Sequence, residues 1–241
     1  MNKSYHIGTF FGIPIKVHWT FSLVFVVVSY IILTENLNIY QSLALLLYMF
    51  CLFLCVVLHE YGHALTARKF GVQTRDILLS PIGGLARLER IPEKPIQEFL
   101  TAIAGPLVNL AIALILFISL LFCEEIVVVV EEDLSILTNP VGFLQLLLML
   151  NIILFGFNLL PAFPMDGGRI LRSLLSMKLP RLQATKIASL IGRLFSIAFV
   201  VIGFYYNIYA LVFIGIFVYV MAYREYEVLK MKQQDEIKLI I

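Results

Sequence analysis

One five-residue segment, His59-Glu60-Tyr61-Gly62-His63, most constrains what this chain can fold into. Two histidines four residues apart lie on one face of a helix, about one turn apart, so both imidazoles can reach one zinc ion. The glutamate between them can take a proton from a water molecule at that ion. Residues 42–58, immediately before the segment, carry no charge. The segment therefore predicts a water-activating zinc site built into a membrane helix.

A histidine pair that only hydrogen-bonds neighbouring helices is the structural alternative. The chain has four histidines, so a chance match to the spacing is improbable. Ionisable side chains at membrane depth are functional by default, which favours the metal site. His6 and His18 stand alone, and we expect ordinary interfacial hydrogen bonds from them.

The composition is typical of a membrane protein. The chain is 61% hydrophobic and 14% charged, with a mean hydropathy of +0.94, whereas soluble domains hold about 25% charged residues. A net charge of +2 gives no indication of a nucleic acid partner. The apolar composition instead predicts a lipid bilayer as the environment of the chain. Six apolar stretches approach the ~20 residues that span a bilayer, at residues 17–33, 42–66, 99–122, 141–160, 187–204 and 208–223.

The basic residues are distributed asymmetrically around these six spans. The segments 34–41, 123–140 and 205–207 contain no lysine or arginine, and all 18 basic residues fall at the opposite ends of the spans. Basic residues accumulate in cytoplasmic loops. The pattern therefore predicts a multi-pass protein of the cell membrane with both termini in the cytoplasm and the histidine pair near the cytoplasmic end of the second span.

A catalytic zinc ion usually has three protein ligands, and Asp166 is a candidate for the third. Pro161 and Pro164 break the helix after the fourth span and bring Asp166 to about the depth of the histidines. Irregular backbone at that depth is tolerated inside protein or along a water-filled cavity. The alternative is that Asp166 caps a helix that starts near Arg169. The spacing alone favours neither interpretation.

Two further segments favour strands rather than membrane helices. Residues 77–88 are apolar but are interrupted by Pro81 and two glycines, and Phe11, Ile13, Ile15 and Val17 alternate. We expect a small sheet on the cytoplasmic side whose edge pairs with an extended substrate. A plain interfacial hairpin that anchors the helices is the alternative.

Other side chains are expected to be structural. Cys51 and Cys55 continue the histidine face of the helix at steps of four, and packing is the expected role of Cys55. A basic stretch between Arg169 and Lys186, which includes Arg172 and Arg181, is expected to lie on anionic lipid.

The chain resembles the site-2 protease family of intramembrane zinc metalloproteases, in particular its archaeal and bacterial members without a PDZ insertion. The resemblance covers most of the chain and rests on His59 to His63, on Asn158 to Arg169, and on two shorter segments, Pro81-Ile82-Gly83-Gly84 and Ala104-Gly105-Pro106-Leu107-Val108-Asn109. The expected fold is an all-α membrane protein with six transmembrane helices and a small cytoplasmic-side β-sheet. We expect a single domain over residues 1–241, with its catalytic core at about 40–178 and without a CBS or PDZ domain.

The resemblance also implies roles for particular residues. It implies that His59, His63 and Asp166 hold one catalytic Zn2+ ion and that Glu60 is the catalytic base. It suggests that Asn158 binds substrate or the oxyanion. The implied activity is hydrolysis of peptide bonds in or near transmembrane segments of membrane-protein substrates, often regulatory precursors.

Two other functions are compatible with the same residues. A zinc transporter or a non-catalytic zinc-binding scaffold would use His59, His63 and Asp166, but it would not need Glu60 as a proton acceptor. Transport also calls for polar residues along a path through both leaflets, and residues 42–54 supply few. An inactive relative that binds transmembrane helices would not need the intact Glu60. The sequence specifies neither the substrate nor the oligomeric state.

Overall fold

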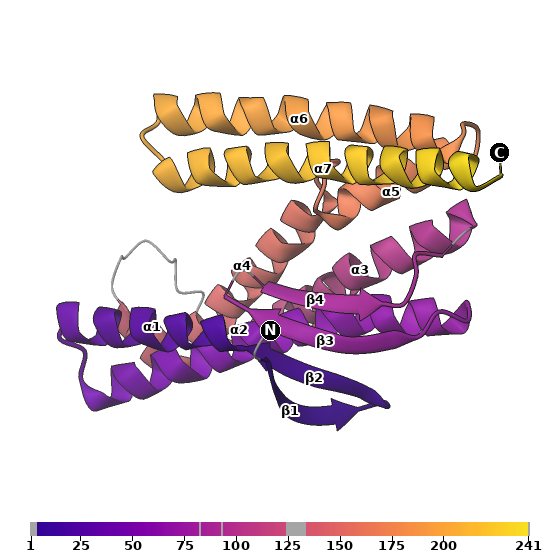
Figure 1. Ribbon diagram of the computed structural model, residues 1–241. Coiled ribbons are helices and arrows are strands. Elements are labelled where there is room, and N and C mark those ends of the chain that lie inside the picture. Colours follow the sequence, from indigo (N-terminus) through magenta and orange to yellow (C-terminus); the bar gives the residue numbers. More distant parts are fainter. Residues whose placement is uncertain (1–3, 82, 93, 124–133, 241) are drawn as a thin grey trace. The chain divides into compact units, whose positions relative to one another are not determined.

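The computed structural model describes residues 4–81, 83–92, 94–123 and 134–240 of the chain. They divide into two units, Met1–Ile91 with Ala104–Phe155, and Pro92–Ile103 with Gly156–Ile241. Figure 1 labels the helices and strands. In chain order they are β1 (Ser4–Phe10), β2 (Ile13–His18), α1 (Ser22–Thr34), α2 (Ile39–Lys69), β3 (Thr74–Ser80), β4 (Gly83–Leu88), α3 (Pro95–Leu121), α4 (Pro140–Leu159), α5 (Asp166–Ser176), α6 (Arg181–Tyr205) and α7 (Tyr209–Ile240).

Within the described residues, α2, α3, α4 and α6 are long and apolar enough to cross a membrane. This finding confirms the prediction of a mainly helical integral membrane protein with a small sheet. Each of these helices contains most of a predicted span, although α2, α3 and α6 begin earlier than expected. The first predicted span, 17–33, covers the last two residues of β2, a short 3-10 turn and most of the 13 residues of α1. The acidic residues 124, 125 and 131–133 of the predicted outer loop lie outside the described residues.

Helix α2 carries the histidine motif, and its ends are well defined. Asn38 and Gln41 form a capping box, in which each side chain accepts a hydrogen bond of 3.0 Å from the other residue's backbone N–H. The helix continues for 31 residues to Lys69. At a rise of ~1.5 Å per residue, His59 lies about 15 Å before the C-terminal end. The motif therefore belongs to the regular interior of a helix, where its side-chain directions are fixed.

The four strands form one sheet in the order β1-β2-β3-β4. The β1/β2 and β3/β4 pairs are antiparallel, and the β2/β3 pair is parallel. The expected strands near residues 11–17 and 77–88 are confirmed, and β1 and β4 are the two edges of the sheet.

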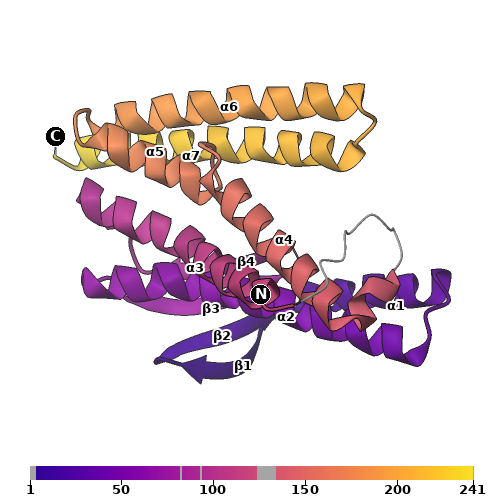
Figure 2. The ribbon, with the colours of Figure 1, turned by 180° about the vertical axis from the view of Figure 1, so that it is seen from behind.

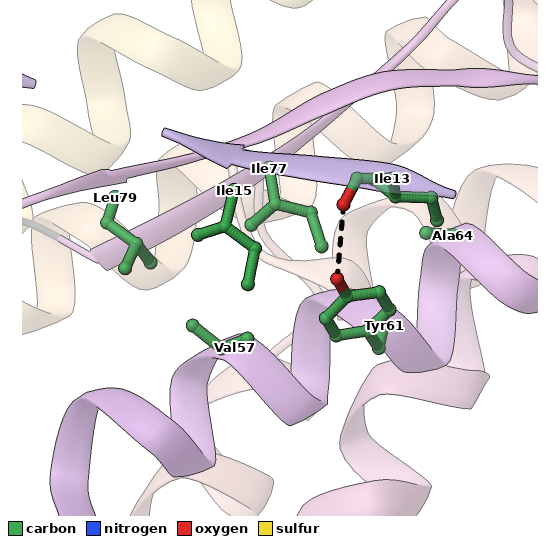
Figure 3. Close-up of a cluster of buried hydrophobic side chains, with 7 residues drawn as sticks. All are labelled: Ile13, Ile15, Val57, Tyr61, Ala64, Ile77 and Leu79. Carbon is green, nitrogen blue, oxygen red and sulfur yellow. Dashed lines mark hydrogen bonds between the residues drawn. The ribbon is translucent and has the colours of Figure 1, made fainter. Parts of the chain in front are cut away.

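The sheet packs against α2 through a buried hydrophobic cluster (Figure 3). The alternation of the strands directs one set of side chains to the helix. Tyr61 adds directional contacts, since its hydroxyl donates to the carbonyl oxygens of Phe10 at 3.2 Å and Ile13 at 3.3 Å. The sheet is therefore fixed on the motif helix itself. The members of the cluster are Ile13, Ile15, Val57, Tyr61, Ala64, Ile77 and Leu79.

A buried carboxylate links three of the strands. Asp76 on β3 accepts hydrogen bonds from Arg87 on β4 at 2.5 and 2.6 Å and lies 2.8 Å from the ammonium group of Lys16 on β2. The hydrogen bonds from Arg87, with a contribution from Lys16, hold the pKa of Asp76 below its usual value. The carboxylate is therefore charged at neutral pH and holds β4 in its place at the edge.

The second unit is built around α5, α6 and α7. Helices α6 and α7 lie side by side and antiparallel in both ribbon views (Figures 1 and 2). Arg172 on α5 is 1% exposed and donates to Glu98 at 2.6 and 2.8 Å and to Glu225 at 2.6 Å. The prediction that Arg172 lies on lipid is wrong, because its guanidinium is enclosed and neutralised by these two carboxylates. They fix α5 within its unit.

Candidate active site

The two motif histidines are buried on α2, and their rings lie edge to face at an angle of 80°. His59 is 6% exposed and His63 is 7% exposed. Their Nε2 atoms lie 3.1 Å apart. Two nitrogens that are each about 2.0–2.1 Å from one zinc ion at a near-tetrahedral angle would have a similar separation. The expected pairing of the two imidazoles is thus present in the structure.

The other nitrogen of His59 has a partner on α3. His59 Nδ1 lies 2.5 Å from Asn109 Oδ1, and Asn109 is fully buried. An amide oxygen only accepts hydrogen bonds, so Nδ1 carries the proton and Nε2 carries the lone pair. Metal-binding histidines commonly have their second nitrogen held in this way. The arrangement prepares His59 for a metal through Nε2.

Gly105 on α3 lies close against both imidazoles. A Cβ atom at this position would overlap His63 Nε2 and lie 2.7 Å from His59 Nε2. The absence of a side chain there keeps the two nitrogen lone pairs accessible. Two nitrogens 3.1 Å apart, a fixed tautomer and a neighbouring position that only glycine can fill fit a zinc ion.

Glu60 contacts the edge strand of the sheet. Its Oε2 accepts a hydrogen bond of 2.7 Å from the backbone N–H of Ala86 on β4. Gly84 allows this approach, since a Cβ there would lie 2.7 Å from Glu60 Cγ and 3.0 Å from Val56 Cγ1. The strand therefore passes directly over the glutamate and orients its carboxylate.

Asp166 and Asn158 belong to the second unit. Asn158 is half-buried in the last turn of α4, which ends before the predicted break at Pro161. Asp166 is buried and is the first residue of α5, whose N-cap is Met165. The cap interpretation of Asp166 is therefore wrong. A carboxylate in the first turn still interacts favourably with the helix dipole.

An apolar cavity on another side of α2 is distinct from these residues. It has a volume of about 650 Å³, and Leu58, Gly62 and Leu107 contribute to its lining. None of the predicted site residues lines it. The cavity lining is mainly apolar, whereas the polar groups gather around His59.

Sequence reasoning missed part of the site. It gave Asn109 no role at the metal, and it did not single out the Ala86 amide or Asn151 on α4. The backbone donor has no sequence signature. Asn151 did have a sequence signature, because a lone amide side chain within an apolar span needs a polar partner.

Substitution of Gly105 by alanine should abolish zinc binding, because the added methyl group would occupy the space beside the imidazole nitrogens. Zinc content of the purified protein, measured by mass spectrometry, checks this outcome. Gly156→Ala is the matched control on α4, since a Cβ at Gly156 meets nothing within 4 Å. Normal zinc content in Gly105→Ala would contradict the assignment of this space to the metal.

Comparisons with known proteins identify relatives of the chain. The model of peptidase family M50 matches residues 47–130 and 123–199. A zinc metalloprotease of Methanocaldococcus jannaschii is 39% identical over 96% of this chain, and the match covers 63% of that protein. A putative zinc metalloprotease of Synechocystis is 35% identical over 72% of this chain and 45% of its own length. The chain thus spans less than two thirds of these curated relatives.

A solved structure agrees with these matches. The site-2 protease from Methanocaldococcus jannaschii has a TM-score of 0.66 and 38% sequence identity. The match covers 93% of this chain and 95% of that structure. With the family model matched over more than half of its residues, the chain belongs to peptidase family M50, the family of the site-2 proteases.

Proposed function

We propose that this protein is an intramembrane zinc endopeptidase that cuts peptide bonds in or near transmembrane segments of protein substrates. The observation that carries the proposal is the position of Glu60 and the hydrogen bond that orients its carboxylate. Glu60 lies between the two paired histidines in the sequence, and a strand amide at 2.7 Å orients its carboxylate. A site that only stored or transported zinc would have no need for an oriented glutamate within the histidine motif.

The proposed zinc ligands are His59, His63 and Asp166. Two imidazoles and a carboxylate are a donor set that could hold a metal ion, and three protein ligands leave one position for water or substrate. The family resemblance assigns the same three residues. The ion pairs of Arg172 fix the helix that begins with Asp166 within its own unit.

The proposed chemistry depends mainly on proton transfer by Glu60. When bound, zinc would polarise the scissile carbonyl and acidify a water molecule. The Ala86 amide occupies Glu60 Oε2 and leaves Oε1 to accept the proton of the attacking water. The same carboxyl group then delivers the proton to the leaving amine. Asn158 is proposed to donate to the oxyanion through its side-chain amide.

The proposed membrane arrangement retains the six spans. Four long helices and the shorter α1 are apolar, and α7 begins with the sixth predicted span. The one-sided distribution of basic residues supports cytoplasmic termini and a site near the cytoplasmic face of the cell membrane. We treat residues 1–241 as one catalytic domain with its core at about 40–178.

Edge strand β4 is the proposed docking site for the unwound substrate. In an antiparallel strand, backbone groups point alternately to the partner strand and away from it. The N–H of Ala86 bonds to Glu60, so it points away from β3. The neighbouring groups of Gly84 and Leu88 share that direction. A peptide that pairs with this edge would pass beside the Glu60 carboxylate.

The Glu60→Gln variant should bind zinc normally and lose peptidase activity by several orders of magnitude, because a neutral amide cannot accept the proton. Incubation of purified protein with a transmembrane substrate, with and without a chelator, checks the cleavage, and the zinc content of the variant, measured by mass spectrometry, checks the binding. Glu89→Gln, an exposed glutamate of the same unit, is the control and should cut normally. Cleavage by Glu60→Gln would eliminate the proposed mechanism and favour a zinc scaffold or transporter.

A photo-crosslinking residue in place of Leu85 or Leu88 on β4 should capture substrate near its scissile bond. Mass spectrometry of the crosslinked peptide locates the contact. A crosslinker at Tyr5 on β1 is the matched control, since Tyr5 is 63% exposed on the opposite edge of the same sheet. Equal capture at both edges, or capture at Tyr5 alone, would exclude β4 as the docking strand.

A further inference from the structure

A chain of buried amide hydrogen bonds extends from His59 through α3 to α4. His59 Nδ1 contacts Asn109 Oδ1 at 2.5 Å, and Asn109 Nδ2 donates to Asn151 Oδ1 at 2.9 Å. Asn151 Nδ2 donates to the carbonyl oxygen of Leu147 at 2.9 Å and contacts Cys55 Sγ at 3.5 Å. Both asparagines are 0% exposed. Three helices therefore meet at a dry polar network that ends on a proposed zinc ligand.

The carbonyl oxygen of Leu147, at the end of the network away from His59, determines which group donates and which accepts in each hydrogen bond. A backbone carbonyl only accepts, so the side of Asn151 that faces Leu147 must be its NH2 group. Oδ1 of Asn151 then faces Asn109 and can only accept. Asn109 must therefore present its own NH2 group to Asn151 and its oxygen to His59. Only the His59 tautomer with a proton on Nδ1 satisfies that oxygen.

We propose that Asn151 is a positioning residue for the zinc site and acts through the amide orientation of Asn109 on the tautomer of His59. The inference rests on the proposed function, because it concerns the metal that Glu60 would use. Without Asn151, the amide of Asn109 is free to turn and present its NH2 group to the imidazole. That orientation favours the proton on Nε2, the atom that must bind the metal.

Simple helix packing makes a different prediction for Asn151. A buried amide that only joins helices contributes to the stability of the protein. Its loss would lower the unfolding temperature without changing the affinity for zinc. A residue that sets the ligand tautomer changes zinc affinity as well, by about 10–100-fold for outer partners of metal ligands.

Zinc affinity of the detergent-purified, metal-depleted protein tests the proposal, by competition with a chromophoric chelator. Asn151→Leu should bind zinc at least tenfold more weakly than the wild type. Asn151→Asp, in its protonated form, keeps an oxygen for Asn109 and a donor for Leu147, and should restore most of the affinity. Ser189→Ala is the packing control, since it removes a buried bond of 2.6 Å to Ala222 in the other unit.

The possible outcomes distinguish the positioning role of Asn151 from the proposed peptidase function. Ser189→Ala should lower the unfolding temperature and leave zinc affinity unchanged. Wild-type affinity in Asn151→Leu overturns the positioning role while the peptidase proposal stands. Equal losses of affinity in Asn151→Leu and Ser189→Ala also overturn it, because the loss would then follow stability. A wild-type protein that binds no zinc overturns both proposals.

Discussion

Burial of polar side chains inside apolar helices is the constraint on which the rest of this structure depends. A buried polar group without a hydrogen-bond partner costs several kcal/mol, about 2–7 depending on the reference state. The imidazole of His59 therefore needs a partner for each nitrogen, and Asn109 supplies one. Asn109 needs a partner in turn and finds it in Asn151. The requirement extends outward until it reaches a backbone carbonyl at Leu147.

The sheet supplies the hydrogen-bond donor that the carboxylate of Glu60 needs. A carboxylate on a membrane helix needs donors, and side-chain donors would bring further charges or bulk into the site. A strand edge supplies a neutral backbone N–H instead, and Ala86 provides it. The hydrophobic cluster and the Tyr61 hydrogen bonds hold the sheet on α2, and Asp76 ties β4 to the other strands. The sheet is thus part of the proposed active site as well as the proposed platform for substrate.

Much of this arrangement follows from periodicity and could be predicted. The spacing of His59 and His63 gives their shared face, the apolar runs give the helices, and the prolines at 161 and 164 give the break after α4. The partners of those residues could not be predicted, because they depend on which helices meet and at what height. Asn109 and Ala86 lie 50 and 26 residues from their partners. Arg172 shows the same limitation, since its basic segment suggested lipid whereas Glu98, 74 residues away, encloses it.

The convergence of two histidines from α2 and one aspartate from the start of α5 on a single zinc ion is the central claim. Zinc X-ray absorption spectroscopy of an Asp166→Cys variant tests it most directly, because a thiolate at that position changes the scattering element. The account predicts one sulfur scatterer at ~2.3 Å in the variant and only nitrogen and oxygen at ~2.0–2.1 Å in the wild type. A zinc-loaded variant without a sulfur scatterer, or a wild-type spectrum that already contains one, would contradict the claim.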